Sequence, residues 1–295
     1  MRLAVMGAGK WGQALAHAFA QRNDVVITSR RTRSIEGFVD RETALSREYL
    51  VMAIPAQAVR GWMEEYFVDR GQKLLVAAKG IETQTGAFLN EIYSRFVPDE
   101  RLAFLSGPSF AAEVQRSLPT ALVVSSTNKL LAHTFAEAFP DFIKGYADDD
   151  VVGAEVAGAY KNVIAIAGGV CDGLELGNNA RAALIARGLV EMTRFGVSFG
   201  AREATFLSLG GAGDLFLTAS STLSRNYRVG LGLAAGKPVE QIVEEVGEVA
   251  EGVPTTKALY DLARAHDLYL PIAREVYAMI YEAKDPRTSV HDLLT

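Results

Sequence analysis

Short apolar runs recur along the first half of the chain, and amphipathic patterns with helical spacing lie between several of them. The apolar runs cover residues 3–6, 25–28, 49–54, 74–78, 102–105 and 121–125. The helical patterns cover residues 12–21, 57–67 and 85–96. Strands that alternate with helices form mostly parallel sheets with helices on their faces. The first half therefore predicts an α/β domain.

The pattern changes after Asp150, where clear strands end and apolar positions recur at helical spacing. The predicted helical stretches are residues 151–170, 180–199, 238–246, 255–266 and 271–281. Glycine pairs and prolines separate them, as in packed helices with short connections. We predict an α/β domain over residues 1–150 and an all-α domain over residues 151–295.

Bulk composition limits the classes of partner. The formal net charge of -5 over 295 residues gives no general basic surface, so we expect no nucleic acid and no anionic membrane as partner. No apolar run reaches the roughly 18 residues of a membrane span. The chain has a single cysteine, Cys171, and no secretory pattern at its start, so the expected location is the cytoplasm.

A glycine-rich turn follows the first predicted strand and precedes the first predicted helix. Its sequence GAGKWG places Gly7 at the tight turn, Gly9 where backbone approaches a pyrophosphate, and Gly12 where helix and strand pack closely. A structural glycine turn is the alternative reading. The strand, turn and helix context favours a Rossmann-type dinucleotide-binding domain.

The end of the second predicted strand carries no carboxylate for a ribose 2′-hydroxyl. Arg30 and Arg31 stand there instead, and guanidinium groups suit the 2′-phosphate of NADP. The alternative is a solvated basic turn. We therefore expect NADP(H) as the preferred cofactor, with NAD(H) as the second choice.

Two further segments follow strands at the edge where such sheets bind ligands. Lys79 comes directly after the run 74–78, although a surface lysine is the usual alternative. The turn SGPSF offers backbone amides and the hydroxyl of Ser109, or is only a Gly-Pro turn. Both segments are candidates for substrate or cofactor contact.

Chemistry-bearing residues gather in the second half. Lys161 and Asn162 stand in an apolar stretch, where burial would lower the pKa of a lysine toward the range of acid–base catalysis. A snorkelling lysine at a helix end is the alternative. Asp214, Arg225 and Asn226 follow, and this set suits a small phosphorylated alcohol or ketone. The four histidines lack metal-ligand spacing, so we expect no metal.

The motifs GAGKWG, AKG, SGPSF, GAYKNV, GGAGDL, SRN and AEG follow one another in this order. With them the chain resembles the bacterial-type NAD(P)-dependent sn-glycerol-3-phosphate dehydrogenases over nearly its whole length. The resemblance implies reversible reduction of dihydroxyacetone phosphate to sn-glycerol 3-phosphate, for glycerophospholipid synthesis. It also implies a homodimer.

The resemblance also implies roles for individual residues. Lys161 would be the proton donor and acceptor, and Asp214 would orient its ammonium. The residues expected around the substrate are Lys79, Gly107, Ser109, Lys161, Asn162, Asp214, Ser224, Arg225 and Asn226. Besides Gly7, Gly9, Gly12 and Arg31, the residues expected at the cofactor are Lys10, Trp11, Arg30, Lys79, Ala111, Arg225, Val249 and Glu251.

Departures and alternatives accompany this resemblance. Residues 31–48 form a shorter connection than the family usually has, and Ser109 stands where many members have threonine. A related β-hydroxyacid or phosphogluconate dehydrogenase would also pair such a domain with a catalytic lysine, but it would need a clamp for its substrate carboxylate. A non-catalytic NADP-binding protein would not need Lys161 and Asp214 together.

Overall fold

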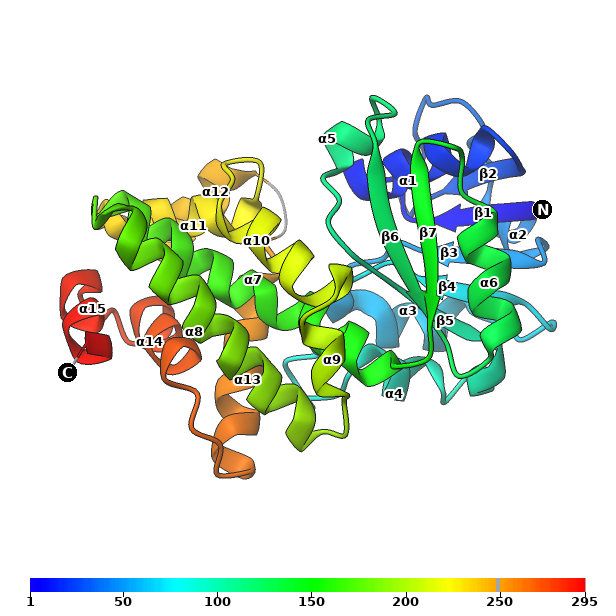
Figure 1. Ribbon diagram of the computed structural model, residues 1–295. Helices are drawn as coiled ribbons and strands as arrows, with labels where there is room; N and C mark the ends of the chain where they lie inside the picture. Colours follow the sequence, from blue (N-terminus) through cyan, green and yellow to red (C-terminus); the bar gives the residue numbers. More distant parts are fainter. Residues whose placement is uncertain (248–249, 295) are drawn as a thin grey trace. The chain divides into compact units, whose positions relative to one another are not determined.

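The computed structural model describes residues 1–247 and 250–294, which gather into two compact units (Figure 1). Unit 1 comprises Met1–Ala78 and Leu89–Ala154, and unit 2 comprises Lys79–Phe88 and Glu155–Thr295. Residues 79–88 thus cluster with the second unit although they interrupt the first along the chain. The boundary near residue 150 stays a prediction about separately folding domains.

Unit 1 is built on a sheet of seven strands within the described residues, in the order β2-β1-β3-β4-β5-β6-β7. Every neighbouring pair is parallel except β5 with β6. The strands are β1 (Arg2–Met6), β2 (Asp24–Thr28), β3 (Tyr49–Met52), β4 (Lys73–Val76), β5 (Leu102–Ser106), β6 (Thr120–Ser125) and β7 (Ile143–Asp148). The mostly parallel sheet confirms the predicted α/β class.

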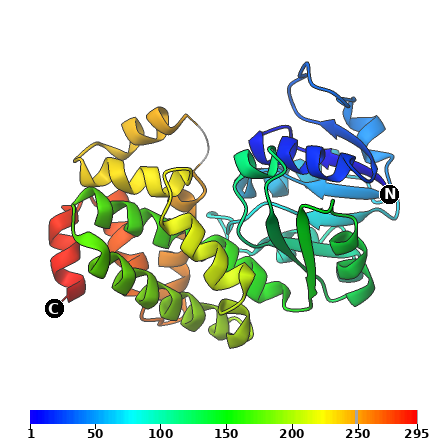
Figure 2. The same cartoon turned by 45° about the horizontal axis from the view of Figure 1, so that its top comes forward.

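Helices cover this sheet, and one of its faces forms a continuous apolar core. The helices of unit 1 are α1 (Lys10–Ala20), α2 (Arg41–Leu45), α3 (Val59–Tyr66), α4 (Leu89–Tyr93), α5 (Ala111–Val114) and α6 (Lys129–Glu137). Leu15 and Phe19 of α1 lie four residues apart and so share the buried helix face, where the Phe19 ring stacks on Phe139 at 4.8 Å. Figure 2 shows α1, in dark blue, against the strands of this unit.

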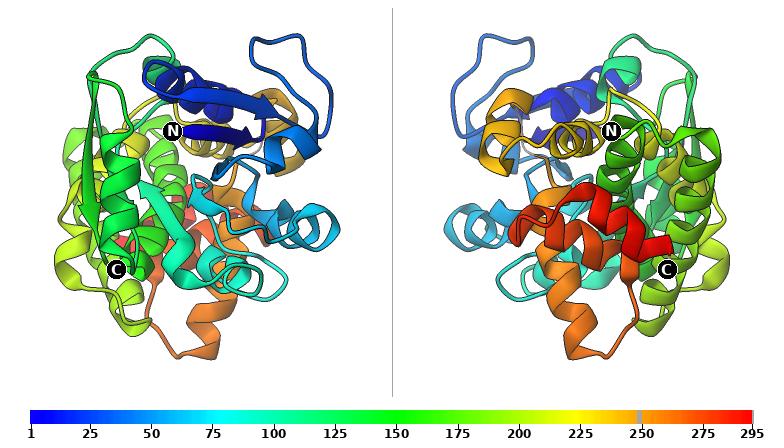
Figure 3. Two further views of the ribbon diagram at one scale, coloured as in Figure 1. Left: turned by 90° about the vertical axis from the view of Figure 1, so that its right-hand side faces the viewer. Right: turned by 90° about the vertical axis from the view of Figure 1, so that its left-hand side faces the viewer.

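Unit 2 is helical, which confirms the all-α prediction for the second half. Its helices are α7 (Val151–Gly173), α8 (Gly177–Ser198), α9 (Glu203–Phe206), α10 (Asp214–Ala219), α11 (Arg225–Ala234), α12 (Val239–Val246), α13 (Gly252–Ala265), α14 (Pro271–Tyr281) and α15 (Pro286–Leu294). The helices α13, α14 and α15, orange to red in Figure 3, pack in succession. None of the helices in the described ranges is long and apolar enough to span a membrane.

The central helix α7 is buried along most of its length and packs very closely on α11. A Cβ atom at Gly169 would overlap the carbonyl oxygen of Tyr227, and one at Gly230 would overlap that of Ile166. Only glycine permits this approach of two helix backbones. The crossing fixes where the residues of α11 stand relative to those of α7.

A buried carboxylate joins three helices of unit 2. Glu191 of α8 accepts a hydrogen bond from the Tyr160 hydroxyl at 2.7 Å and from the backbone N–H groups of Ile272 and Ala273 at 2.9 and 2.8 Å. Burial raises the pKa of Glu191, and the two amides at the start of α14 favour its charged form. This contact ties α7, α8 and α14 together beside Lys161.

Several elements differ from the sequence-based prediction. The helix predicted over residues 85–96 is limited to α4, because residues 81–88 turn back on themselves with Glu82 N–H bonded to Ala87 O at 3.0 Å and Gly86 at a φ of 73°. Strand β7 and the helices α2, α5, α6, α9, α10, α11 and α15 lie outside the predicted elements. Strand β7 reads IKGYAD, which is only partly buried and lacks a continuous apolar run.

Candidate active site

A buried cluster of opposite charges lies in unit 2. The carboxylate of Asp214 stands at the start of α10, with 1% of its side chain exposed. Its Oδ1 accepts a hydrogen bond from the Lys161 ammonium of α7, and its Oδ2 accepts one from Lys79 at 2.6 Å. Two lysines therefore share one carboxylate, and the structure brings together three residues that sequence predicted for the site.

Burial and charge change the acid–base properties of this cluster. Burial lowers the pKa of Lys161 to about 7; the charge of Asp214 opposes this change, and the charge of Lys79 adds to it. Burial would raise the pKa of Asp214, but the two ammonium groups outweigh it and hold that pKa below its usual value. Lys161 can therefore change protonation near neutral pH while Asp214 stays ionised.

Thr218 is a member of the cluster that sequence reasoning missed. Its hydroxyl accepts a hydrogen bond from Lys161 Nζ at 3.0 Å and donates one to Asp214 Oδ1 at 3.2 Å. Thr218 follows Asp214 by four residues, so both side chains lie on one face of α10. Helical spacing after the GGAGD motif was the signal that could have identified it.

The two candidate asparagines form a buried relay next to this cluster. Asn226 Nδ2 donates to Asn162 Oδ1 at 2.9 Å, and Asn226 Oδ1 accepts from the Gly252 backbone N–H at 2.9 Å. Asn162 Nδ2 donates to Gly158 O at 3.2 Å. The hydrogen bonds of these two side-chain amides thus join α11 to α7 and to the start of α13.

The start of α11 carries the candidate phosphate ligands. The Ser224 hydroxyl accepts from the Tyr227 backbone N–H at 3.2 Å and so caps the helix. Arg225 occupies the first helical position and is half-buried. Glu251 caps α13 without a side-chain hydrogen bond to it. Val249 lies outside the described residues.

The glycine-rich turn of unit 1 has the shape that a pyrophosphate requires. Gly7 has a φ of 118°, and a Cβ there would lie 2.5 Å from Ala53 O. A Cβ atom at Gly12 would overlap Gly7 O, whereas a Cβ atom at Gly9 would meet no other part of the chain within 4 Å. Because Gly9 caps α1 with no side-chain acceptor for the helix amides, the turn fits an anionic group.

Two larger side chains flank this turn. Lys10 is exposed at the first position of α1. The Trp11 indole Nε1 donates to Ala77 O at 3.1 Å, which fixes the ring beside the end of β4. Both residues therefore lie at the edge of the sheet where the glycine turn opens.

The two arginines expected at a 2′-phosphate follow β2 and are exposed. The Ser29 hydroxyl donates to the Arg31 backbone oxygen at 2.7 Å, which shapes this turn. The chain then returns along β2, where the Ile27 N–H donates to Gly37 O at 2.9 Å and Ile27 O accepts from Val39 N–H at 2.9 Å. The connection after Arg31 thus bonds through its residues 37–39 to β2, the edge strand of the sheet.

The remaining candidates of unit 1 follow β5. Gly107 has a φ of 110°, a backbone conformation that favours glycine, and a Cβ there would lie 3.0 Å from Ala121 O. The Ser109 hydroxyl donates to Gly107 O at 3.2 Å and stabilises the turn. Ala111 begins α5. The substrate and cofactor roles of these residues stay predictions.

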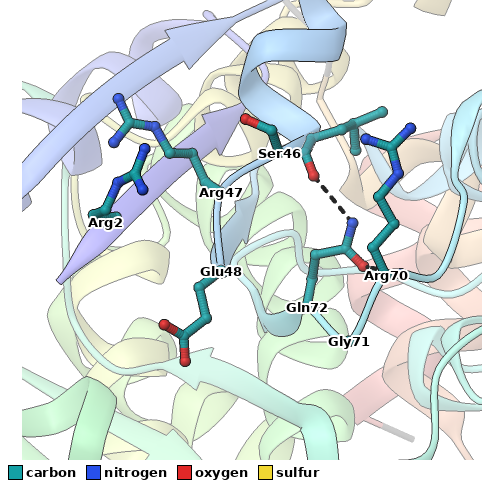
Figure 4. Close-up of a pocket in the computed structure, with 8 residues that line it drawn as sticks. Arg2, Ser46, Arg47, Glu48, Arg70, Gly71 and Gln72 are labelled. Carbon is teal, nitrogen blue, oxygen red and sulfur yellow. Dashed lines mark hydrogen bonds between the residues drawn. The ribbon is translucent and has the colours of Figure 1, made fainter.

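A hollow of about 270 Å³ lies at the opposite edge of the same sheet (Figure 4). Arg2, Glu48 and Gln72, which line it, stand at the amino ends of β1, β3 and β4. The Gln72 side-chain amide donates to Leu45 O at 3.1 Å, and Arg47 pairs with Asp24. This hollow is therefore separate from the carboxyl-end edge that carries the glycine turn.

No group of three or more His, Cys, Asp or Glu side chains is placed to hold a metal ion in the described part of the chain. Asp214, the buried carboxylate of the charged cluster, accepts a hydrogen bond from a lysine ammonium on each of its two oxygens.

Comparison with known proteins covers both halves of the chain. The models of the NAD-dependent glycerol-3-phosphate dehydrogenase N-terminus and C-terminus match residues 32–132 and 150–291. A relative from a Nitratiruptor species is 60% identical and one from Sulfurimonas denitrificans is 61% identical, each over 100% of this chain and over 98% and 99% of the relative. Both are named glycerol-3-phosphate dehydrogenase (NAD(P)+).

A solved structure agrees with these matches. The crystal structure of glycerol-3-phosphate dehydrogenase from Coxiella burnetii superposes with a TM-score of 0.91 at 32% identity, covering 99% of this chain and 98% of that one. The likeness therefore extends over both units rather than over one motif.

Proposed function

Because the chain belongs to the NAD-dependent glycerol-3-phosphate dehydrogenase family, we propose that it catalyses the reversible reduction of dihydroxyacetone phosphate to sn-glycerol 3-phosphate. The observation that carries the proposal is the buried Lys161, whose ammonium is held by Asp214 and whose pKa is lowered to about 7. Such a group can give a proton to an alkoxide and take it back in the reverse reaction. A non-catalytic cofactor-binding protein would have no use for this costly arrangement.

Carbonyl reduction needs a hydride at carbon and a proton at oxygen. When bound, the reduced nicotinamide supplies the hydride to C2 of the substrate. Lys161 donates a hydrogen bond to the carbonyl oxygen, stabilises the negative charge that develops there, and transfers its proton. Asp214 and Thr218 hold the Lys161 nitrogen in place, because both contact Nζ directly.

The substrate phosphate is assigned to the start of α11. Arg225 provides a guanidinium that can donate two hydrogen bonds to phosphate oxygens, and the amino end of a helix favours an anion. Ser224 and Asn226 flank it, with Asn162 bonded to Asn226. Lys79, Gly107 and Ser109 complete the proposed substrate contacts on the family resemblance.

For the cofactor we propose NADP(H), with NAD(H) as an alternative. The open space at Gly9 and the uncapped amides of α1 support a pyrophosphate there, with Lys10 and Trp11 beside it. Arg30 and Arg31 support a 2′-phosphate by their charge and their place after β2. Further proposed contacts are Gly7, Gly12, Lys79, Ala111, Arg225, Val249 and Glu251. No metal takes part in this proposal.

Three wider assignments complete the proposal. The product would enter glycerophospholipid synthesis, as the family resemblance implies. The chain would act in the cytoplasm, which its single cysteine supports because no internal disulfide can form. A homodimer is proposed from the family alone.

The Lys161→Met variant tests the proton-transfer role. We expect the single-turnover rate of dihydroxyacetone phosphate reduction to fall by about 100-fold or more, because general acid catalysis usually contributes about 10²- to 10⁴-fold. NADPH binding, measured by fluorescence titration, should stay nearly unchanged because the glycine turn of unit 1 is intact. A rate above about a tenth of wild type would contradict the role, and lost NADPH binding would indicate a structural lysine instead.

The Arg225→Ala variant tests the phosphate assignment. We expect kcat/KM for dihydroxyacetone phosphate to fall by about 10- to 150-fold, since a hydrogen bond to a charged group is worth about 1.5 to 3 kcal/mol. Unphosphorylated dihydroxyacetone serves as the internal control, and its slower reduction should change little. Equal losses on both substrates would show that Arg225 does not bind the phosphate.

The double variant Arg30→Asp with Arg31→Ala tests the cofactor preference. We expect the ratio of kcat/KM with NADPH to kcat/KM with NADH to fall by about 10-fold or more, because attraction to the 2′-phosphate is lost and repulsion is added. Arg33→Ala, in the same exposed connection, is the matched control. If the double variant kept the wild-type ratio, the arginine pair would have no part in cofactor selection.

A further inference from the structure

The Lys79 side chain extends over Gly158 of the helix α7 to reach Asp214. A Cβ atom placed on Gly158 would lie 3.2 Å from Lys79 Cγ, 3.4 Å from its Cδ and 3.5 Å from its Cβ. The aliphatic part of Lys79 therefore runs directly over the backbone of Gly158. Its ammonium ends 2.6 Å from Asp214 Oδ2, with 16% of the side chain exposed.

The segment that carries Lys79 is fixed to unit 2 at several points. The Phe88 ring packs edge-on to Phe195 and Phe199 at centroid distances of 6.3 and 5.3 Å. The Thr83 hydroxyl donates to Pro254 O at 3.2 Å. Residues 79–88 are thus attached to the helices α8 and α13 as well as to Asp214.

We propose that Gly158 is a positioning residue for Lys79: the absence of a side chain there opens the slot through which Lys79 reaches Asp214, while Phe88 holds the other end of the segment. The proposal rests on the proposed function, because it assigns Gly158 a part in the same reaction. Gly158 itself contacts neither substrate nor cofactor in this account, and it acts only through Lys79.

The position of Gly158 along α7 makes this arrangement specific. Gly158 precedes Lys161 by three residues, so the slot and the proton-donating lysine share one face of the helix. A methyl group at 158 requires Lys79 to move by a few tenths of an ångström. Since the contact with Asp214 is short and buried, such a shift weakens it and moves a positive charge away from Lys161.

The Gly158→Ala variant is the direct test. We expect kcat/KM for dihydroxyacetone phosphate to fall by about 10-fold, the low end of the range for a lost hydrogen bond to a charged group, because the Lys79–Asp214 contact is weakened rather than removed. Helix formation should not suffer, since alanine is the better helix former. Gly61→Ala is the matched control, because Gly61 lies in α3 with no atom within 4 Å of the added Cβ, and its activity should equal wild type.

A double-mutant cycle separates positioning from general damage to the helix. In the Lys79→Ala background the slot is vacant, so adding Gly158→Ala should change kcat/KM by less than about 2-fold, within the usual limit of additivity for neutral changes. If Gly158→Ala cost the same 10-fold in both backgrounds, Gly158 would act independently of Lys79 and the proposal would be overturned. If the single variant failed to fold, restored folding in the double variant would support the slot, and continued misfolding would contradict it.

A readout without cofactor or substrate completes the test. The midpoint of the pH titration of the Lys161 side-chain NMR signal, assigned by its loss in Lys161→Met, reports the pKa of that lysine in the free protein. The charge of Lys79 lowers this pKa, so Gly158→Ala and Lys79→Ala should both raise the midpoint. An unchanged midpoint in Gly158→Ala would contradict the proposal. Absence of dihydroxyacetone phosphate reduction by the wild type would instead contradict the proposed function and leave this midpoint to decide the positioning role.

Discussion

The shared carboxylate of Asp214 is the interaction on which the rest of the site depends. Removing charges from water costs several kcal/mol for each ion, and only close opposite charges and hydrogen bonds offset it. Asp214 meets this condition with Lys161 on one oxygen and Lys79 on the other. One negative charge for two lysines leaves the cluster with an excess of positive charge. Burial lowers the pKa of Lys161 to about 7, and the charge of Lys79 adds to this effect while the charge of Asp214 opposes it.

The fold of unit 2 brings Lys161, Asp214 and Lys79 into contact from three separate parts of the chain. Lys161 comes from α7, Asp214 from α10, and Lys79 from a segment that interrupts unit 1 along the chain. Glycines make the close contacts possible, because α7 approaches α11 at Gly169 and accommodates Lys79 at Gly158. Glu191 then ties α7 to its neighbours through Tyr160. Asp214 and Thr218 of α10 contact the Lys161 nitrogen directly, so a shift of α10 relative to α7 would disturb the cluster.

Sequence predicted the parts of this site that follow from periodicity and from motifs in context. The glycine turn, the sheet and the long buried helix with Lys161 were all predicted, because apolar runs and glycine spacing report them directly. The attachment of residues 79–88 to unit 2 was not, because it depends on ring contacts between Phe88 and residues more than a hundred positions away. Thr218 and Gly158 were missed for a similar reason. The contacts of Thr218 with Lys161 and of Gly158 with Lys79 depend on the packing of distant segments, which the local sequence does not report.

The pH dependence of kcat/KM in the two directions of the wild-type reaction tests whether Lys161 transfers the proton. Reduction needs the Lys161 ammonium, so its rate should fall as pH rises through the pKa of Lys161, about 7, whereas oxidation needs the neutral amine and should rise through the same value. Opposite profiles with a common midpoint would support the buried lysine as the proton-transfer group. Profiles that are flat between about pH 6 and about pH 9, or that change in the same direction, would contradict it.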